Sequence, residues 1–181
     1  MKVNAYINST HTNTWGVVFG DTSLTALMTL PPKKSYITNK SSLIHGKLVL
    51  SKSTNAPKYD ERDVSLVFYL RANSLPQFLT RYHAFAQQFD GGEFTLKLEV
   101  TEGLTTWTEQ YTLLFVSCTQ FSQFNGRLGK FTLKVNEPDP TNRTYSVVTE
   151  TPESSNSNSD TSTPVETPTP SGEESPNTEN D

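Results

Sequence analysis

The stretch YDERDVSLVFYLRA, residues 59–72, runs from a cluster of charged residues into a regular alternation of apolar and polar residues. Successive side chains of an extended chain point to opposite faces, so this period of two predicts a β-strand over residues 63–71 with one face on a hydrophobic core. The apolar positions of that face are Val64, Leu66, Phe68 and Leu70. The other face carries Val67 and Tyr69, which predicts an outer side that is partly covered by a neighbouring chain.

The charged residues 60–63 admit three interpretations: a catalytic pair of acids with room for a cation, a salt-bridged turn, or the rim of a surface that meets another protein. A calcium loop needs oxygen ligands at alternate positions and a distal glutamate, which this turn lacks. Arg62 lies between the acids and favours a local ion pair, which contributes little when it is exposed. We therefore interpret the cluster as a polar turn that sets the entry of the strand and the rim of a contact between subunits.

One amphipathic helix is predicted over residues 74–90, SLPQFLTRYHAFAQQFD. Ser74 is a natural N-cap, and Gln77 three residues later completes a capping box. Gly91 and Gly92 then end the helix, because glycine adopts the left-handed conformation without strain. Apolar residues recur at spacings of three and four and form one stripe: Leu75, Phe78, Leu79, Tyr82, Phe85, Ala86 and Phe89.

Short apolar or alternating segments elsewhere predict further strands. They cover residues 14–21, 46–52, 93–100, 108–121 and 126–137. The chain between residues 22 and 45 is less regular. Pro31-Pro32 excludes regular helix or a central strand at the start of residues 31–45, where Lys33, Lys34 and Lys40 predict a solvated and positively charged loop. The sum is a mainly β fold, a β-sandwich or open barrel, with one flanking α-helix.

Composition divides the 181 residues into two parts. From residue 147 onward Ser, Thr, Pro, Asn and acids dominate, and such a segment buries too little apolar surface to offset its ordering entropy. We therefore expect a folded domain over residues 1–146 and a disordered acidic tail over residues 147–181. The tail holds eight of the 19 acids and none of the 15 basic residues, so the domain carries a formal charge of +4. That charge is too small to indicate nucleic-acid binding by itself.

Signals for catalysis or for a bound cofactor are missing from the sequence. His11, His45 and His83 lie far apart without metal-ligand spacing, and Cys118, the one cysteine, is expected to be a small buried residue. The GRLGK segment, residues 126–130, lies in a strand pattern without the helix that a phosphate loop requires. We expect a protein that is not an enzyme and has no catalytic residue, metal or cofactor.

The order of these features resembles the N-terminal domain of the distal tail (Dit) proteins of long, non-contractile-tailed bacteriophages, which is similar to the phage tail-tube subunits. The resemblance covers residues 10–137. It rests on element order and on three short segments, residues 15–17, 46–47 and 62–66. This chain departs from the fuller distal tail pattern, because the acidic tail stands where those proteins have a second, galectin-like domain. A hub or receptor-related role is therefore in doubt, and tube-like or small-hub roles remain open.

The resemblance implies a non-enzymatic virion protein that assembles into rings, as a hexamer, around a channel through which phage DNA passes without specific binding. Other phage tail proteins would be its partners. The start of the chain has no apolar run of signal-peptide length, and 18 consecutive apolar residues occur nowhere, so we expect no membrane partner and synthesis in the bacterial cytoplasm. The residues we expect at the contact between subunits are Lys33, Lys34, Tyr36, Asp63, Val67 and Tyr69.

A different class of function is a monomeric β-sandwich module that binds carbohydrate or nucleic acid. Such a module needs exposed aromatic side chains on which sugars or bases stack. Trp15, Trp107 and Tyr111 are the candidates for that platform.

Overall fold

The computed structural model describes residues 1–49 and 56–150, and over these residues the protein is mainly β, as the sequence predicts. No helix among them is long and apolar enough to cross a membrane. In chain order the elements are β1 (Lys2–Ile7), β2 (Thr10–His11), the 3-10 helix η1 (Thr12–Trp15), β3 (Val17–Phe19), α1 (Asp21–Met28), β4 (Thr38–Asn39), β5 (Leu48–Val49), β6 (Arg62–Arg71), α2 (Leu75–Ala86), the 3-10 helix η3 (Gln87–Phe89), β7 (Glu93–Glu102), β8 (Thr105–Ser122), β9 (Leu128–Glu137) and β10 (Thr144–Thr149).

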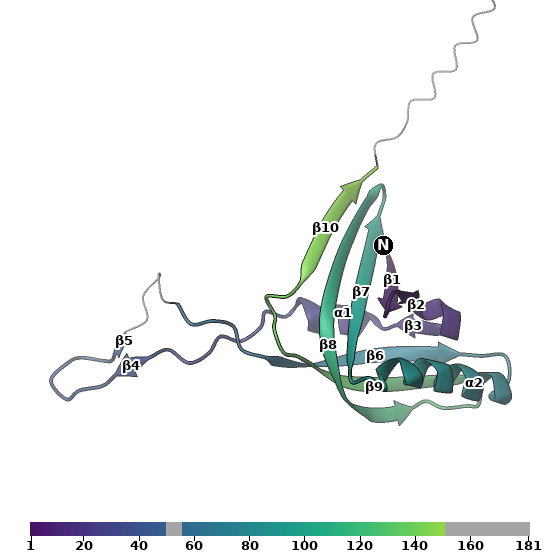
Figure 1. Cartoon of the computed structure of the whole chain (residues 1–181), viewed down its shortest axis with the longest axis horizontal. Coiled ribbons are helices and arrows are strands. Elements are labelled where there is room, and N and C mark those ends of the chain that lie inside the picture. The colour runs from purple at the N-terminus through teal and green to yellow at the C-terminus, as the bar shows by residue number, and fades with distance from the viewer. Residues whose placement is uncertain (50–55, 151–181) are drawn as a thin grey trace, which may run out of the picture. The chain divides into compact units, whose positions relative to one another are not determined.

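Eight strands form one curled antiparallel sheet in the order β2-β1-β7-β8-β9-β6-β3, with β10 paired to β8 outside this path (Figure 1). The long strand β8 joins the two parts of the sheet. Strand β7 follows one edge of β8, whereas β10 and β9 share the other edge: β10 pairs with residues 105–110 and β9 with residues 114–122. Strands β4 and β5 pair only with each other and form a separate two-stranded sheet.

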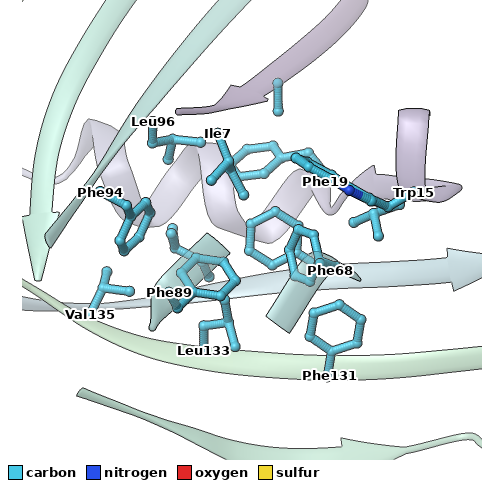
Figure 2. Close-up of a cluster of buried hydrophobic side chains, with 14 of the residues drawn as sticks. Ile7, Trp15, Phe19, Phe68, Phe89, Phe94, Leu96, Phe131, Leu133 and Val135 are labelled. Atoms are coloured by element: carbon cyan, nitrogen blue, oxygen red, sulfur yellow. The ribbon is translucent and has the colours of Figure 1, made fainter. Parts of the chain in front are cut away.

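Strand β6 confirms the alternation from which the fold was predicted. Its apolar face is buried, and Phe68 at its centre packs against Phe19, Phe85 and Phe131 with ring centroids 5.5 to 5.8 Å apart. Figure 2 shows side chains of β1, β6, β7 and β9 meeting in this cluster. Because the buried side chains lie on one face of the curled sheet, the opposite face of β6 is available for contacts outside this core.

Helix α2 begins with the predicted N-cap Ser74, but the returning bond to Gln77 comes from the residue before the N-cap and not from Ser74 itself. The Ser74 hydroxyl accepts a hydrogen bond from the Gln77 backbone N–H at 3.4 Å, and the Gln77 side chain accepts one from the Asn73 N–H at 2.8 Å. The buried stripe is narrower than predicted, because Leu75 and Leu79 are 47% and 45% exposed. The helix therefore packs on the sheet mainly through phenylalanine rings. These are Phe78 and Phe85 of α2, continued by Phe89 of η3.

Gly129 of β9 makes room for one of these rings, which is its role in the GRLGK segment. A Cβ atom at this position would lie 2.7 Å from the Cζ atom of Phe78. We expect Gly129→Ala to lower the free energy of unfolding by about 1–3 kcal/mol, the usual cost of overpacking a core. Denaturant unfolding measures this, with Gly91→Ala as the matched control because only one atom lies within 4 Å of its added Cβ. Equal stability of the two variants would contradict the close approach of Phe78.

Helix α1 lies before the predicted loop, almost entirely in residues that were predicted only as less regular, and a second α-helix is therefore an addition to the predicted fold. Strand β3 pairs with residues 68–70 of β6, and the chain then turns into α1. Ser23 of α1 continues the pairing with its side chain: its Oγ atom accepts from the Val67 N–H at 2.6 Å and donates to the Val67 carbonyl at 3.0 Å. Gly20 N–H donates to the same carbonyl at 2.9 Å. The edge of β6 is thus closed by a helix that the local sequence pattern did not indicate.

The boundaries of the domain also differ from the prediction. Strand β10 runs to Thr149, so residues 147–149 belong to the sheet and not to the tail that was predicted to begin there. Residues 151–181, the remainder of that tail, lie outside the described part of the chain. Of the strand predicted over residues 46–52, the structure describes only the two residues of β5 as strand. Strands β1, β2 and β10 were not predicted at all.

Candidate assembly surface

The segment between α1 and β6 forms an exposed arm, defined here as residues 33–59, of which 33–49 and 56–59 are described. Every residue from 33 to 48 is exposed, including several large apolar side chains. The arm pairs with itself through β4 and β5, with Thr38 opposite Val49 and Asn39 opposite Leu48. The exposed apolar residues are Tyr36, Ile37, Leu43, Ile44 and Leu48, which are 43–92% exposed.

The two ends of the arm are held together at its base. Lys33 and Tyr59 form an antiparallel bridge, and the Lys33 ammonium lies 5.3 Å from the centroid of the Tyr59 ring. The Lys34 N–H donates to the Lys58 carbonyl at 2.9 Å, and the Asp60 N–H donates to the Pro32 carbonyl at 2.8 Å. These contacts close the loop, so the exposed residues beyond them project from a defined point on the domain.

Arg62, the first residue of β6, is buried and does not form the local ion pair that its acidic neighbours suggested. Its Nε atom donates to Oε2 of Glu137 on β9 at 2.5 Å. Its guanidinium also donates to the backbone carbonyls of Leu27 at 2.9 Å and of Thr29. These carbonyls belong to the C-terminal end of α1, where a cation satisfies groups that have no partner within the helix. Arg62 thus joins the start of β6, the end of β9 and the end of α1.

Glu137 accepts a second guanidinium from the connection between β9 and β10. Arg143 donates to Glu137 through Nε at 2.6 Å and through Nη2 at 2.8 Å. The Arg143 guanidinium also lies 5.2 Å from the centroid of the buried Tyr111 ring, whose hydroxyl donates to Glu109 at 2.7 Å. Burial, together with the hydrogen bond to Glu109, raises the pKa of Tyr111 far above its usual value. This network is a structural clamp, since its charged groups are paired with one another.

The six predicted contact residues fall in two groups. Lys33, Lys34 and Tyr36 lie on the arm, and Tyr36 is 52% exposed. The other three lie on the outward face of β6, where Asp63 accepts a hydrogen bond from Asn136 at 3.0 Å and forms an ion pair with Lys134 at 3.1 Å. The hydrogen bond from Asn136 and the ammonium of Lys134 lower the pKa of Asp63.

Asp63 and the arm base border one surface hollow. Its volume is about 330 Å³, and its lining includes Leu30, Pro32, Asp63 and Ser65. Residues 60–63, which were predicted as the rim of a contact between subunits, therefore lie where the arm leaves the domain.

Val67 and Tyr69 on the outward face of β6 are half-buried within the chain itself. Gly20 lies against them, because a Cβ atom built on Gly20 would be 3.2 Å from the Tyr69 ring and 3.3 Å from the Val67 Cβ. Lys130 of β9 extends over Tyr69, with 5.9 Å between its ammonium and the ring centroid. Part of the cover that the sequence suggested for this face is thus supplied by the chain's own residues.

Strand β10 offers a second exposed surface. All six of its residues are exposed, and Tyr145, Val147 and Val148 are 58–76% exposed. It pairs with β8 on one side, and no other strand of the described chain pairs with it. A strand edge of this kind has backbone groups available for another strand.

The three aromatic residues proposed for a ligand platform do not share an exposed surface. Trp15 and Tyr111 are 8% and 1% exposed. Trp107 is half-buried and borders an apolar hollow with Leu24 and Val100. The arrangement therefore lacks the row of exposed rings on which sugars or bases would stack.

Cys118 is exposed, not buried as predicted. The pairing of β8 with β9 shifts register on both sides of it, between Phe115 and Ser117 and between Cys118 and Gln120. The bulge between Phe115 and Ser117 brings Cys118 opposite Leu133, a buried residue of β9, so these two residues lie on the same face of the sheet. Cys118 borders a hollow of about 190 Å³ beneath α2 together with Tyr82 and other aromatic residues.

The histidines stay apart in the folded chain. His11 accepts a hydrogen bond from the Asn13 N–H at 3.0 Å, while His45 on the arm and His83 on α2 are exposed. Over residues 1–49 and 56–150, no three His, Cys, Asp or Glu side chains gather closely enough to hold a metal ion. Comparison of the chain with protein-family models and with curated proteins gave no match.

Proposed function

We propose that this chain is a non-enzymatic structural subunit of a bacteriophage tail, which assembles with its own copies into a ring around the DNA channel. The observation that carries the proposal is the arm, whose side chains from residue 33 to 48 are all exposed and include five large apolar residues. Apolar surface of this extent is unfavourable in water and typically marks a contact with another protein. A stable protein interface uses about 20–30 residues from each partner, which is the length of this arm.

The arrangement of the exposed surfaces favours a ring over a two-fold dimer. The arm leaves the domain beside Pro32 and Asp60. The open edge belongs to β10, which pairs with the edge of β8 opposite to the edge that pairs with β7. Two different surfaces on one subunit suit head-to-tail contacts, and such contacts close into rings when the rotation between neighbours allows it. The arm of one copy would lie on the domain of the next.

The order of the elements supports the proposal that this ring is part of a phage tail. A short strand, an exposed charged arm, a long strand with one apolar face, an amphipathic helix and three long strands follow one another, as in the tail-tube fold that the sequence resembles. Position along the tail, as tube or distal hub, depends on the partners above and below the ring.

Light scattering of the purified chain over a range of concentrations tests the proposal. We expect a particle of about hexamer mass, or longer stacks, and rings with a central hole in negative-stain images. The assembled fraction should rise with concentration, because association between separate copies follows mass action. A monomer at every concentration would contradict self-assembly and would leave a monomeric binding module as the better interpretation.

A further inference from the structure

The face of the sheet that buries the core continues beyond the core as an apolar surface. Alternate residues of a strand share a face, and on β7 the buried Leu96 and Leu98 are followed on the same face by Val100. Val100 pairs with Trp107 of β8, which pairs with Val147 of β10. Val100 and Trp107 are half-buried and Val147 is 58% exposed, so the chain itself covers this row only in part.

Helix α1 and the start of the chain turn this part of the sheet into the wall of a hollow of about 330 Å³. Met1 and Met28 on its border are 77% and 69% exposed. Glu109 is the charged residue of the lining, and its carboxylate already accepts from the Tyr111 hydroxyl at 2.7 Å and lies 4.0 Å from Arg143. The hollow therefore suits an apolar side chain. We define the Trp107 face as the apolar residues of this hollow and row: Met1, Leu24, Met28, Val100, Trp107 and Val147.

Acidic residues border the Trp107 face at the turn between β7 and β8. Glu102 ends β7 on the same face as Val100, and Glu150 follows β10 and donates through its backbone N–H to that turn at 2.9 Å. Both are exposed, and neither belongs to an ion pair among residues 1–49 and 56–150. Lys2 of the neighbouring strand pairs with Thr101, so it lies on the opposite face. The border thus holds two carboxylates without a cationic partner.

The tip of the arm, residues 40–47, carries the complementary groups. Leu43 and Ile44 are 92% and 43% exposed. Lys40 and Lys47 flank them, are exposed, and belong to none of the ion pairs in the described part of the chain. Residues 22–59 contain six lysines and no acid, so the charge on the arm is entirely positive.

We propose that the arm tip binds the Trp107 face of a second copy, with its apolar side chains in the hollow and its lysines beside the acidic border. This inference rests on the proposed function, because it names the surface that the arm would contact on the next subunit. Side chains 33–48 are all exposed, so the arm does not cover this face in its own subunit. Two copies that met through their Trp107 faces would instead bring two acidic borders together, which like-charge repulsion disfavours.

Charge reversal on both sides tests the contact by complementation. Glu102→Lys with Glu150→Lys makes the border basic, whereas Lys40→Glu with Lys47→Glu makes the arm tip acidic. Each double variant alone brings like charges together, so its association should be at least about tenfold weaker than that of the wild type at low salt. In an equal mixture each arm meets a face of opposite charge, and light scattering should detect assembly again.

The matched control reverses two exposed acids away from the Trp107 face. Glu93 begins β7, at the opposite end from Glu102, and Asp90 precedes it. The variant Asp90→Lys with Glu93→Lys changes the net charge as much as the border variant does. It should assemble like the wild type, since these acids do not meet the arm. Weakening equal to that of the border variant would show that net charge alone controls association, and would overturn the contact.

Quenching of tryptophan fluorescence by acrylamide reports whether the Trp107 face is covered. Trp15 is 8% exposed, so quenching should come mainly from Trp107 and should fall as the wild type assembles. Assembly with unchanged quenching and without complementation would overturn this contact and leave self-assembly intact. Reduced quenching that is insensitive to reversal of the arm lysines would show that two Trp107 faces meet, which also overturns it. A wild-type monomer at every concentration would overturn the proposed function together with this contact.

Discussion

Glu137→Ala is expected to lower the free energy of unfolding by about 3–5 kcal/mol, the usual effect of removing one partner from a buried ion pair. The Glu137 side chain is 1% exposed and accepts hydrogen bonds from both Arg62 and Arg143. Its loss would leave the Arg62 guanidinium buried without a counter-charge. Because Arg62 also holds the end of α1, the variant should loosen the base of the arm as well as the sheet. Denaturant unfolding followed by tryptophan fluorescence measures the loss.

Asp63→Ala is the matched control for this experiment. Asp63 is the neighbour of Arg62 on β6, and its carboxylate also pairs with a cation on β9, Lys134. Its side chain is 53% exposed, so water replaces the lost contacts and the stability should remain close to that of the wild type. If the two alanine variants were equally stable, the Glu137 pair would contribute no more than a surface ion pair, and the clamp described above would be wrong.

The clamp shows which signal in the sequence was overlooked. Arg62 lies two residues before Val64, and Glu137 lies two residues after Val135, so each continues the inward-facing register of its strand. A charged residue at an inward position requires a partner, and two such residues of opposite sign on separate strands predict a buried pair. The local ion pair was predicted from the immediate neighbours of Arg62 alone, and its non-local partner was therefore missed.

The elements that could be predicted are those with a long and regular pattern. Strands β6, β7 and β9 and helix α2 each repeat one period over ten residues or more, and local geometry alone then determines which side chains face the core. Strand β8 keeps its period only as far as the register shift after Phe115. Helix α1 has eight residues, and β10 has six that are all exposed, so their own patterns carry little information. Contacts with distant residues specify them instead, such as the hydrogen bonds between Ser23 and Val67.

The arm was predicted in part. Its lysines and the two prolines directly before it indicated an exposed, positively charged loop, and residues 33–48 are exposed throughout. The pairing of β4 with β5 was not predicted, because each strand has only two residues. The contact between subunits through the β6 residues stays a prediction. Gly20 and Ser23 of the same chain lie against Val67, which reduces the area of this residue that a neighbouring subunit could contact.

Removing the apolar side chains of the arm is expected to abolish self-association at concentrations where the wild type assembles. In the variant Leu43→Ser, Ile44→Ser and Leu48→Thr, three side chains that are 43–92% exposed lose their apolar surface. If a neighbouring copy covers each of them, each change removes about 1 kcal/mol or more, and the three together weaken association at least about 100-fold. The subunit itself should remain folded, since these side chains contribute little to its core. Light scattering measures assembly, and thermal unfolding at low concentration measures the fold.

A control variant separates the arm from apolar surface in general. Leu75 and Leu79 on α2 are 47% and 45% exposed, similar to Ile44 and Leu48. Replacing both leucines by Gln preserves helix propensity and removes about as much exposed apolar surface as the changes at Ile44 and Leu48 together. Assembly should survive these changes, because the assembly surface proposed here is the arm and not the outward face of α2. If the α2 variant became monomeric while the arm variant still assembled, copies of this chain would associate through the helix, and the arm would have to serve a different partner.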